Sequence, residues 1–116
     1  MSLPETCKRL SVYIGGHYRT NGLPMYEAVV MHAKQQGLSG VTVFTGLMSF
    51  GHLKLLEGER LDGDKLSDER PVLVQIVESE EKINELLPEV KRVLGTHGLV
   101  TVEDVQVVHQ ATPMGS

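Results

Sequence analysis

Residues 71–94, PVLVQIVESEEKINELLPEVKRVL, contain the two patterns that decide the fold of this chain. The first seven residues form a nearly continuous apolar run, which is typical of a strand that is covered on both faces or central in a sheet. Ser79 then offers a helix N-cap, with Glu80 and Glu81 in the first turn, where the helix dipole favours negative charge. An amphipathic helix follows, and Gly95 ends it. Its apolar positions are Ile83, Leu86, Leu87, Val90, Val93 and Leu94.

The sequence on either side of this pair supplies the other elements. Alternating or β-branched residues predict strands, and a proline followed by apolar residues at four-residue spacing predicts a helix. Pro88 does not fit a regular helix over 80–94, because it removes a backbone donor and should kink the helix there. The remaining expected elements are a strand over 10–14, a loop over 17–22, a helix from Pro24 to Gly37, a strand over 41–44, a long connection over 47–70, and a strand over 99–108 with an irregularity at Glu103-Asp104.

This order predicts an α+β fold of the ferredoxin-like type, βαββαβ. Its four strands would form an antiparallel sheet with both helices on one face. We expect a single domain over residues 8–110, with a long loop at about 47–70 and terminal tails at 1–7 and 111–116. The other face of the sheet would carry Val, Leu and Tyr side chains without a cover. Such a patch predicts that the chain forms oligomers.

Composition excludes several partners and compartments. The chain has 116 residues and a formal net charge of −4, which argues against a nucleic-acid partner held by phosphate contacts. Its single cysteine, Cys7, cannot form an intramolecular disulfide, so we expect a cytoplasmic protein. No apolar run approaches the roughly 20 residues that cross a bilayer, so we expect no membrane insertion.

We also expect no enzymatic activity. The sequence has no phosphate-binding Walker loop, and no serine, histidine and acid lie in a recognisable catalytic motif. Arg19 follows a pair of glycines, as an acylphosphatase would require, but the rest of that signature is missing. An RNA-recognition domain would need exposed aromatic residues on its first and third strands, and the third strand has none.

Three segments are candidates for binding a ligand: residues 37–51, residues 95–98 and the long connection 47–70. Glycines let the backbone turn sharply and approach a ligand, which leaves N–H groups free to donate. Each segment also has an ordinary structural explanation, as a helix cap, a tight turn or a surface excursion. Their joint presence favours a binding site more than any one of them does.

The same segments carry a resemblance to a known family. Residues 37–43, GLSGVTV, are similar to the segment of PII signal-transduction proteins that leads into their T-loop, and Ser49-Phe50-Gly51 resembles the start of that loop. From Leu10 to His109 the chain more closely resembles the PII-like family called domain of unknown function 190. The matching stretches are residues 24–28 (PMYEA), 42–51 (TVFTGLMSFG) and 98–105 (GLVTVEDV).

The resemblance implies a homotrimer whose clefts between subunits bind an adenine nucleotide. The loop at 47–70 would then report occupancy to a target protein. Carried over residue by residue, it assigns two sets of ligand-binding residues. The first set is Gly40, Thr42, Gly46, Phe50 and Gly51, and the second is Gly95, Thr96, His97 and Gly98.

Two departures from the PII pattern bear on the ligand. True PII proteins place a lysine in the turn that here holds His97, and arginines near the C-terminus, where residues 108–112 have none. Because charge-assisted hydrogen bonds are the strong ones, their loss disfavours a triphosphate. The sequence is still compatible with a nucleotide that has fewer phosphates and with a ligand other than a nucleotide. An alternative function is that of a metal- or small-ligand-binding oligomer without a signalling role, although the five histidines do not have the spacing of metal ligands.

Overall fold

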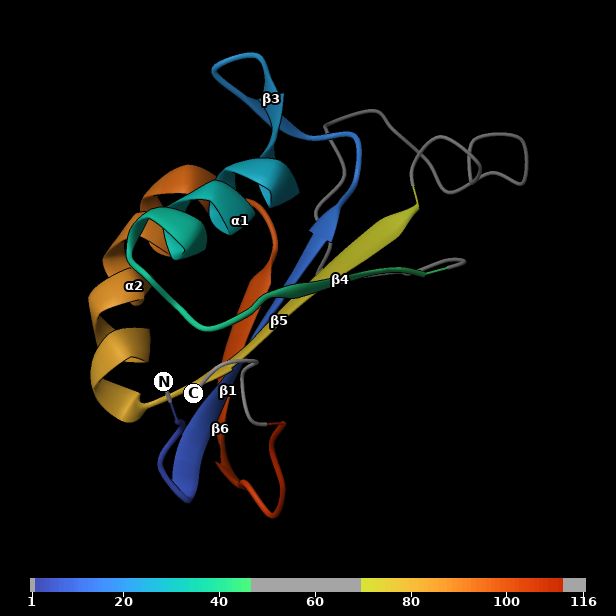
Figure 1. The fold of residues 1–116 in the computed structure, drawn as a ribbon. Helices are drawn as coiled ribbons and strands as arrows, with labels where there is room; N and C mark the ends of the chain where they lie inside the picture. Colours follow the sequence, from blue (N-terminus) through green and yellow to red (C-terminus); the bar gives the residue numbers. More distant parts are fainter. Residues whose placement is uncertain (1, 47–69, 112–116) are drawn as a thin grey trace.

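The computed structural model describes residues 2–46 and 70–111 (Figure 1). Within these residues two helices and six strands form, the two shortest strands being a separate hairpin. The elements in chain order are β1 (Thr6–Gly15), β2 (Arg19–Thr20), β3 (Leu23–Pro24), α1 (Met25–Gln35), β4 (Thr42–Thr45), β5 (Pro71–Glu78), α2 (Glu80–Leu94) and β6 (Leu99–Gln106).

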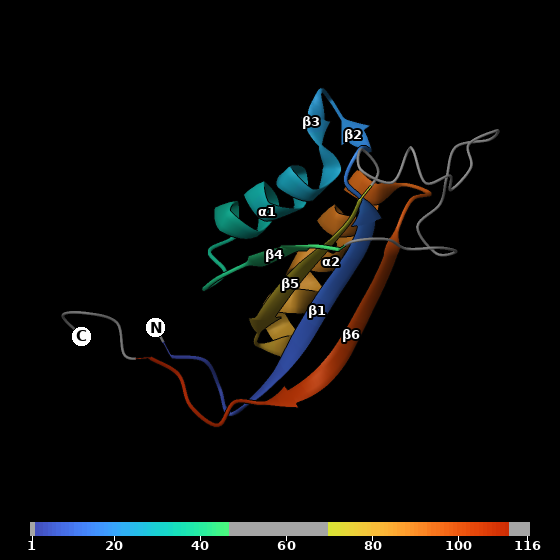
Figure 2. The ribbon, with the colours of Figure 1, turned by 90° about the vertical axis from the view of Figure 1, so that its right-hand side faces the viewer.

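The four longer strands form one antiparallel sheet in the order β4-β5-β1-β6. Both helices lie on one face of this sheet, as the two views in Figures 1 and 2 show. The expected ferredoxin-like fold is therefore confirmed. β4 and β6 lie at the two edges, so each has one strand neighbour within the described residues.

The core lies between the sheet and the two helices. β5 is central in the sheet, and its side chains alternate between buried and half-buried, so its apolar run is fully covered on the helix side alone. On β1 the buried residues that face the helices are again every second one. The core residues are Leu10, Val12, Ile14, Tyr18, Met25, Val29, Ala33, Val72, Val74, Ile76, Ile83, Leu86, Val90 and Leu94.

The helix ends follow the local sequence signals. Pro24 precedes the first residue of α1, and Gly37 beyond its end has φ = 76°, a value that favours glycine. The hydroxyl of Ser79 accepts a hydrogen bond from the backbone N–H of Lys82, which caps α2 as expected. α2 continues through Pro88 to Leu94. Neither helix of the described residues is long and apolar enough to cross a membrane.

Three local expectations were wrong. β1 begins at Thr6, four residues earlier than the alternation predicted, so Cys7 lies inside the strand. Residues 19–24, expected in part to be loop, form the β2–β3 hairpin around Asn21 and Gly22, which both have positive φ. β6 ends at Gln106 and pairs without interruption through Glu103 and Asp104, because each has a direct partner on β1.

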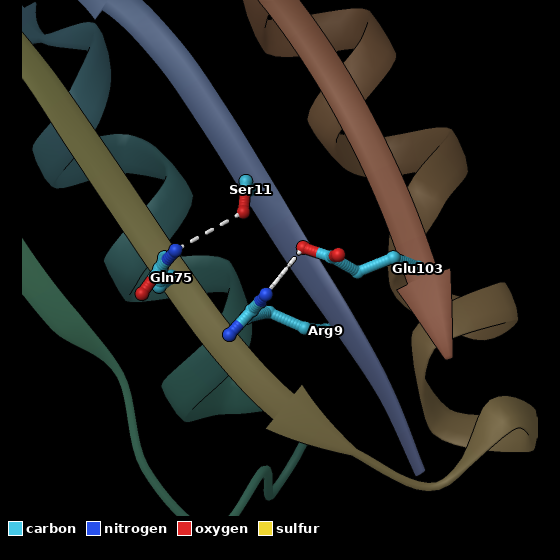
Figure 3. A network of polar contacts seen from close by, with 4 residues as sticks. All are labelled: Arg9, Ser11, Gln75 and Glu103. Atoms are coloured by element: carbon cyan, nitrogen blue, oxygen red, sulfur yellow. Dashed lines mark hydrogen bonds and ion pairs between the residues drawn. The ribbon is translucent and has the colours of Figure 1, made fainter. Parts of the chain in front are cut away.

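The open face of the sheet is less apolar than expected, because a polar network crosses its middle (Figure 3). Arg9 donates two hydrogen bonds to Glu103 on β6, at 2.8 and 2.7 Å. The side-chain amide of Gln75 donates to the hydroxyl of Ser11 at 3.3 Å, and Ser11 is only 2% exposed. Apolar side chains such as Phe44, 47% exposed, lie on the same face.

Candidate functional site

The glycine-rich segments that the sequence singled out converge on one end of the sheet. β1 and β4 end there, and β5 and β6 begin there, because the sheet is antiparallel. Backbone hydrogen bonds hold the segments in place: Gly16 donates to the carbonyl of Arg70 at 2.9 Å, and Gly46 donates to that of Pro71 at 2.8 Å. The turn 95–98 reaches the same end, because β6 starts at Leu99.

Two of these segments lie on opposite edges of the sheet. Gly46 follows the edge strand β4, whereas residues 95–98 precede the other edge strand, β6. Three strand spacings separate the edges, which corresponds to roughly 14 Å at about 4.8 Å per strand. One chain therefore does not bring Gly46 and the turn 95–98 into direct contact.

The turn 95–98 is fixed by its glycines and by the contact of one ring with another. Gly95 and Gly98 have φ values of 60° and 80°, in the region that favours glycine. His97 donates its backbone N–H to the carbonyl of Leu94 at 3.0 Å. Its ring packs against that of Tyr18 at an interplanar angle of 47°, with 4.2 Å between the centroids, and Tyr18 is only 6% exposed. A buried aromatic ring thus holds the imidazole of the turn.

The remaining predicted site residues lie elsewhere. Gly40 and Thr42 lie just before and at the start of β4, at the opposite end of that strand from Gly46. Thr42 pairs with Gln75 and is exposed, and a Cβ on Gly40 would meet open space. Thr96 is exposed in the turn. Phe50, Gly51 and the loop 47–70, apart from Arg70, lie outside the described residues.

The chemistry available at this end of the sheet is backbone donors with few cations. The turn 95–98 contains no lysine or arginine, although Arg70 lies beside Gly16 at this end. Residues 107–111 have neither as well, but they follow the opposite end of β6. Within residues 2–46 and 70–111, no three His, Cys, Asp or Glu side chains lie close enough together to hold a metal ion. His32 is half-buried on α1, with Nδ1 at 3.7 Å from the carboxylate of Glu89.

At the far end of the sheet, a buried carboxylate holds the segment that leads into β4. Glu78 is 3% exposed and accepts hydrogen bonds from the backbone N–H groups of Ser39 at 2.9 Å and Ser79 at 3.2 Å. Burial by itself would raise the pKa of Glu78, but these donors and the Lys82 charge lower it below its ordinary value. Glu78 therefore remains ionised and positions residues 37–40.

Sequence reasoning missed the residues that lie beneath the turn 95–98. Tyr18 and His97 are far apart in the chain, and no local pattern links them. The ring of His17 also contacts that of Tyr18 at an interplanar angle of 34°, with 4.2 Å between the centroids. The one available signal was the glycine pair Gly15-Gly16, which directly precedes His17 and Tyr18. Burial raises the pKa of the Cys7 thiol, so it is not an activated nucleophile.

Comparisons with solved structures agree on the fold. The PII-like protein CPII of Thiomonas intermedia K12, solved with ADP and bicarbonate, is 22% identical, with a TM-score of 0.63 and 90% of each chain covered. The GlnK protein of B. subtilis, solved with ATP, is 16% identical, with a TM-score of 0.50 and 88% of this chain and 86% of that chain covered. At these identities the likeness establishes a PII-like, ferredoxin-like fold.

Sequence comparisons are more specific. A UPF0166 protein of Aquifex aeolicus (strain VF5) is 36% identical over 103 residues, which cover 88% of this chain and 93% of the relative. The model of the family DUF190, described as "Uncharacterized ACR", matches residues 7–107. This protein is therefore a member of the DUF190 family.

Proposed function

We propose that this protein is a PII-like regulatory protein that forms a homotrimer and binds a small ligand in the clefts between its subunits. One observation carries the proposal: Gly46 and the turn 95–98 lie at the same end of the sheet but on opposite edges. A cleft that uses both segments needs two copies of the chain. Binding, rather than catalysis, fits a site built from glycines and backbone donors.

An adenine nucleotide is the first candidate ligand. CPII, whose fold this chain shares, has been solved with ADP. The turn 95–98 has no lysine or arginine, and it carries His97 where PII proteins carry a lysine. Because each phosphate adds negative charge that needs a partner, ADP or AMP fits this site better than ATP.

The signalling output is the second part of the proposal. We assign it to residues 47–70, by their likeness to the T-loop of PII proteins, and the partner would be a target protein. These residues are joined to the site at both ends, since Gly46 and Pro71 are hydrogen-bonded to each other at 2.8 Å. A ligand beside Gly46 would thus lie where the loop leaves the sheet and returns to it.

A thermal-shift screen tests the ligand. Purified protein is heated with AMP, ADP, ATP, Mg²⁺ and Zn²⁺, each added separately. We expect ADP or AMP to raise the melting temperature most, by roughly 10 °C at a hundredfold excess over its dissociation constant, which corresponds to about 2.7 kcal/mol. A shift with a metal alone would instead support a metal-binding oligomer without a signalling role. A screen with no shift would contradict the nucleotide proposal.

The variant His97→Ala separates these two outcomes. In a cleft built mainly from backbone donors, loss of the imidazole should weaken ADP binding by about tenfold or less, since one side-chain hydrogen bond contributes roughly 0.5–1.5 kcal/mol. A metal site that used His97 would instead be lost. Isothermal titration measures both affinities, and His109→Ala, an exposed histidine beyond β6, is the matched control.

A further inference from the structure

A small pocket lies between the two helices and the β2–β3 hairpin, away from the candidate site. The hairpin leads directly into α1, and α1 packs against α2 (Figures 1 and 2). The pocket between these elements, here called the hairpin–helix pocket, has a volume of about 170 Å³. Sites for drug-sized ligands usually measure roughly 300–1,000 Å³, so this one fits a molecule of a few carbon atoms.

The spacing of residues along α1 forms one wall of this pocket. Four residues of the helix line it at positions i, i+3, i+4 and i+7: Ala28, Met31, His32 and Gln35. Residues at this spacing lie along one side of a helix. Arg92 and Val93 of α2 form the facing wall, and residues 20–23 of the hairpin close one end. One chain therefore supplies every wall that the structure describes.

Part of the lining is apolar. Leu23 and Met31 both line the pocket and are 37% and 45% exposed. A single exposed apolar side chain needs no explanation, but here two of them share one hollow with Ala28 and Val93. A ligand with a carbon chain would be stabilised there, because it would remove this apolar surface from water.

The polar part of the lining consists of side chains that can donate hydrogen bonds. They are Thr20, Asn21, His32, Gln35 and Arg92. None of the described residues that line the pocket is acidic, although the whole chain has a net charge of −4. Because hydrogen bonds from a charged donor to a carboxylate are among the strongest in proteins, this lining favours an anionic ligand.

Glu89 orients two of these donors without lining the pocket itself. Its Oε2 atom accepts a hydrogen bond from Arg92 and lies 3.7 Å from Nδ1 of His32. A guanidinium has five N–H donors, so a contact with one carboxylate oxygen leaves donors for a ligand. The negative charge of Glu89 also offsets part of the charge of Arg92. A small anion should therefore bind with modest affinity.

We infer that the hairpin–helix pocket binds a small organic carboxylate with a short carbon chain. The carboxylate accepts hydrogen bonds from the guanidinium of Arg92, beside His32, and the carbon chain lies against Leu23 and Met31. Inorganic phosphate has the charge but no carbon chain, so it fits only the polar part. This site goes beyond the proposed function, because it uses neither Gly46 nor the turn 95–98 and needs only one copy of the chain.

Titration of ¹⁵N-labelled protein with butyrate, followed by the backbone amide signals, tests this site. The ionic strength is held constant, because salt screens exposed charges. We expect saturable shifts confined to residues 20–35 and 89–93, with a Kd on the order of 1 mM. Acetate has two methylene groups fewer and should bind roughly five- to tenfold more weakly. Butyramide, which has the same shape without the charge, and inorganic phosphate should each bind at least about tenfold more weakly.

Three results of the titration would overturn the inference. The first is the absence of a saturable shift with butyrate in these residues. The second is butyramide binding as tightly as butyrate, which would mean that the charge contributes nothing. The third is phosphate binding as tightly as butyrate, which would mean that the carbon chain contributes nothing.

Arg92→Gln tests the charged donor, and Lys91→Gln is its matched control. Both changes remove one positive charge from an exposed residue of α2, but Lys91 does not line the described pocket. Exposed ion pairs contribute little to stability, so both variants should fold, and their amide spectra check this. Arg92→Gln should weaken butyrate binding by about tenfold or more, and Lys91→Gln by less than about twofold. Equal losses would show only a general attraction of charge and would contradict the site.

Leu23→Ser tests the apolar contact without changing any charge. It should weaken butyrate binding by roughly threefold and leave acetate binding unchanged, so that the two ligands bind more alike. If butyrate binding were unchanged, or acetate lost as much affinity as butyrate, Leu23 would not contact the carbon chain and the assignment would be wrong. None of these titrations uses a nucleotide. Their failure would overturn this site alone, while the thermal shift with ADP still tests the proposed function.

Discussion

Replacing Gly98 with alanine is expected to destabilise the fold by about 2–4 kcal/mol, because two costs coincide at this residue. A Cβ on Gly98 would lie 2.7 Å from the backbone carbonyl oxygen of Tyr13, a distance that forces the backbone to move. The residue also has φ = 80°, where side chains other than glycine are strained. Chemical denaturation would measure the loss, and the melting temperature should fall by roughly 10–20 °C.

Gly95→Ala is the matched control for this prediction. Gly95 lies in the same turn and has φ = 60°, but a Cβ there would have no atom within 4 Å. Only the backbone strain remains, so the cost should be about 1–3 kcal/mol and smaller than that of Gly98→Ala. If both variants lost the same stability, the close approach to Tyr13 would contribute nothing and the start of β6 would be less constrained than its geometry indicates.

The main elements were predictable from the sequence because their patterns are local. The apolar run of β5, the cap at Ser79 and the spacing in α2 each arise within one element, and each appears in the structure. The β2–β3 hairpin was missed although its signal is also local: Asn-Gly between short extended segments favours a tight hairpin turn. The hairpin was therefore missed because we interpreted these residues as a loop, although the signal for a turn was present in the sequence.

The candidate site was predictable only in part, because its geometry depends on contacts between distant segments. Glycine content identified Gly46 and the turn 95–98, but no local pattern could place Tyr18 beneath His97. The polar network of Arg9 and Glu103 was missed for the same reason, since it depends on the register of β1 with β6. Alternation of side chains predicts which face a residue occupies, whereas it does not predict which residue lies opposite.

Replacing Glu78 with alanine is expected to cost about 2–4 kcal/mol of stability, because the change removes a buried carboxylate that accepts two backbone hydrogen bonds. The N–H groups of Ser39 and Ser79 both donate to this carboxylate. Gln at this position keeps one acceptor oxygen but loses the charge, so Glu78→Gln should lose less than the alanine variant. The exposed Glu85 of α2 offers a control, and Glu85→Gln should change stability by less than about 0.5 kcal/mol.

The pH dependence of stability follows from the lowered pKa of Glu78. The unfolded chain binds a proton at this glutamate near its ordinary pKa of about 4.3, whereas the folded chain binds it only at lower pH. The stabilising contribution is therefore complete above that ordinary value and is lost as the pH falls through the folded pKa. Urea unfolding at pH 6, 4.5 and 3 should show a steeper acid loss for the wild type than for Glu78→Gln. If the two curves ran parallel, the carboxylate would not be the group that holds residues 37–40 in place, and the lead into β4 would depend on packing alone.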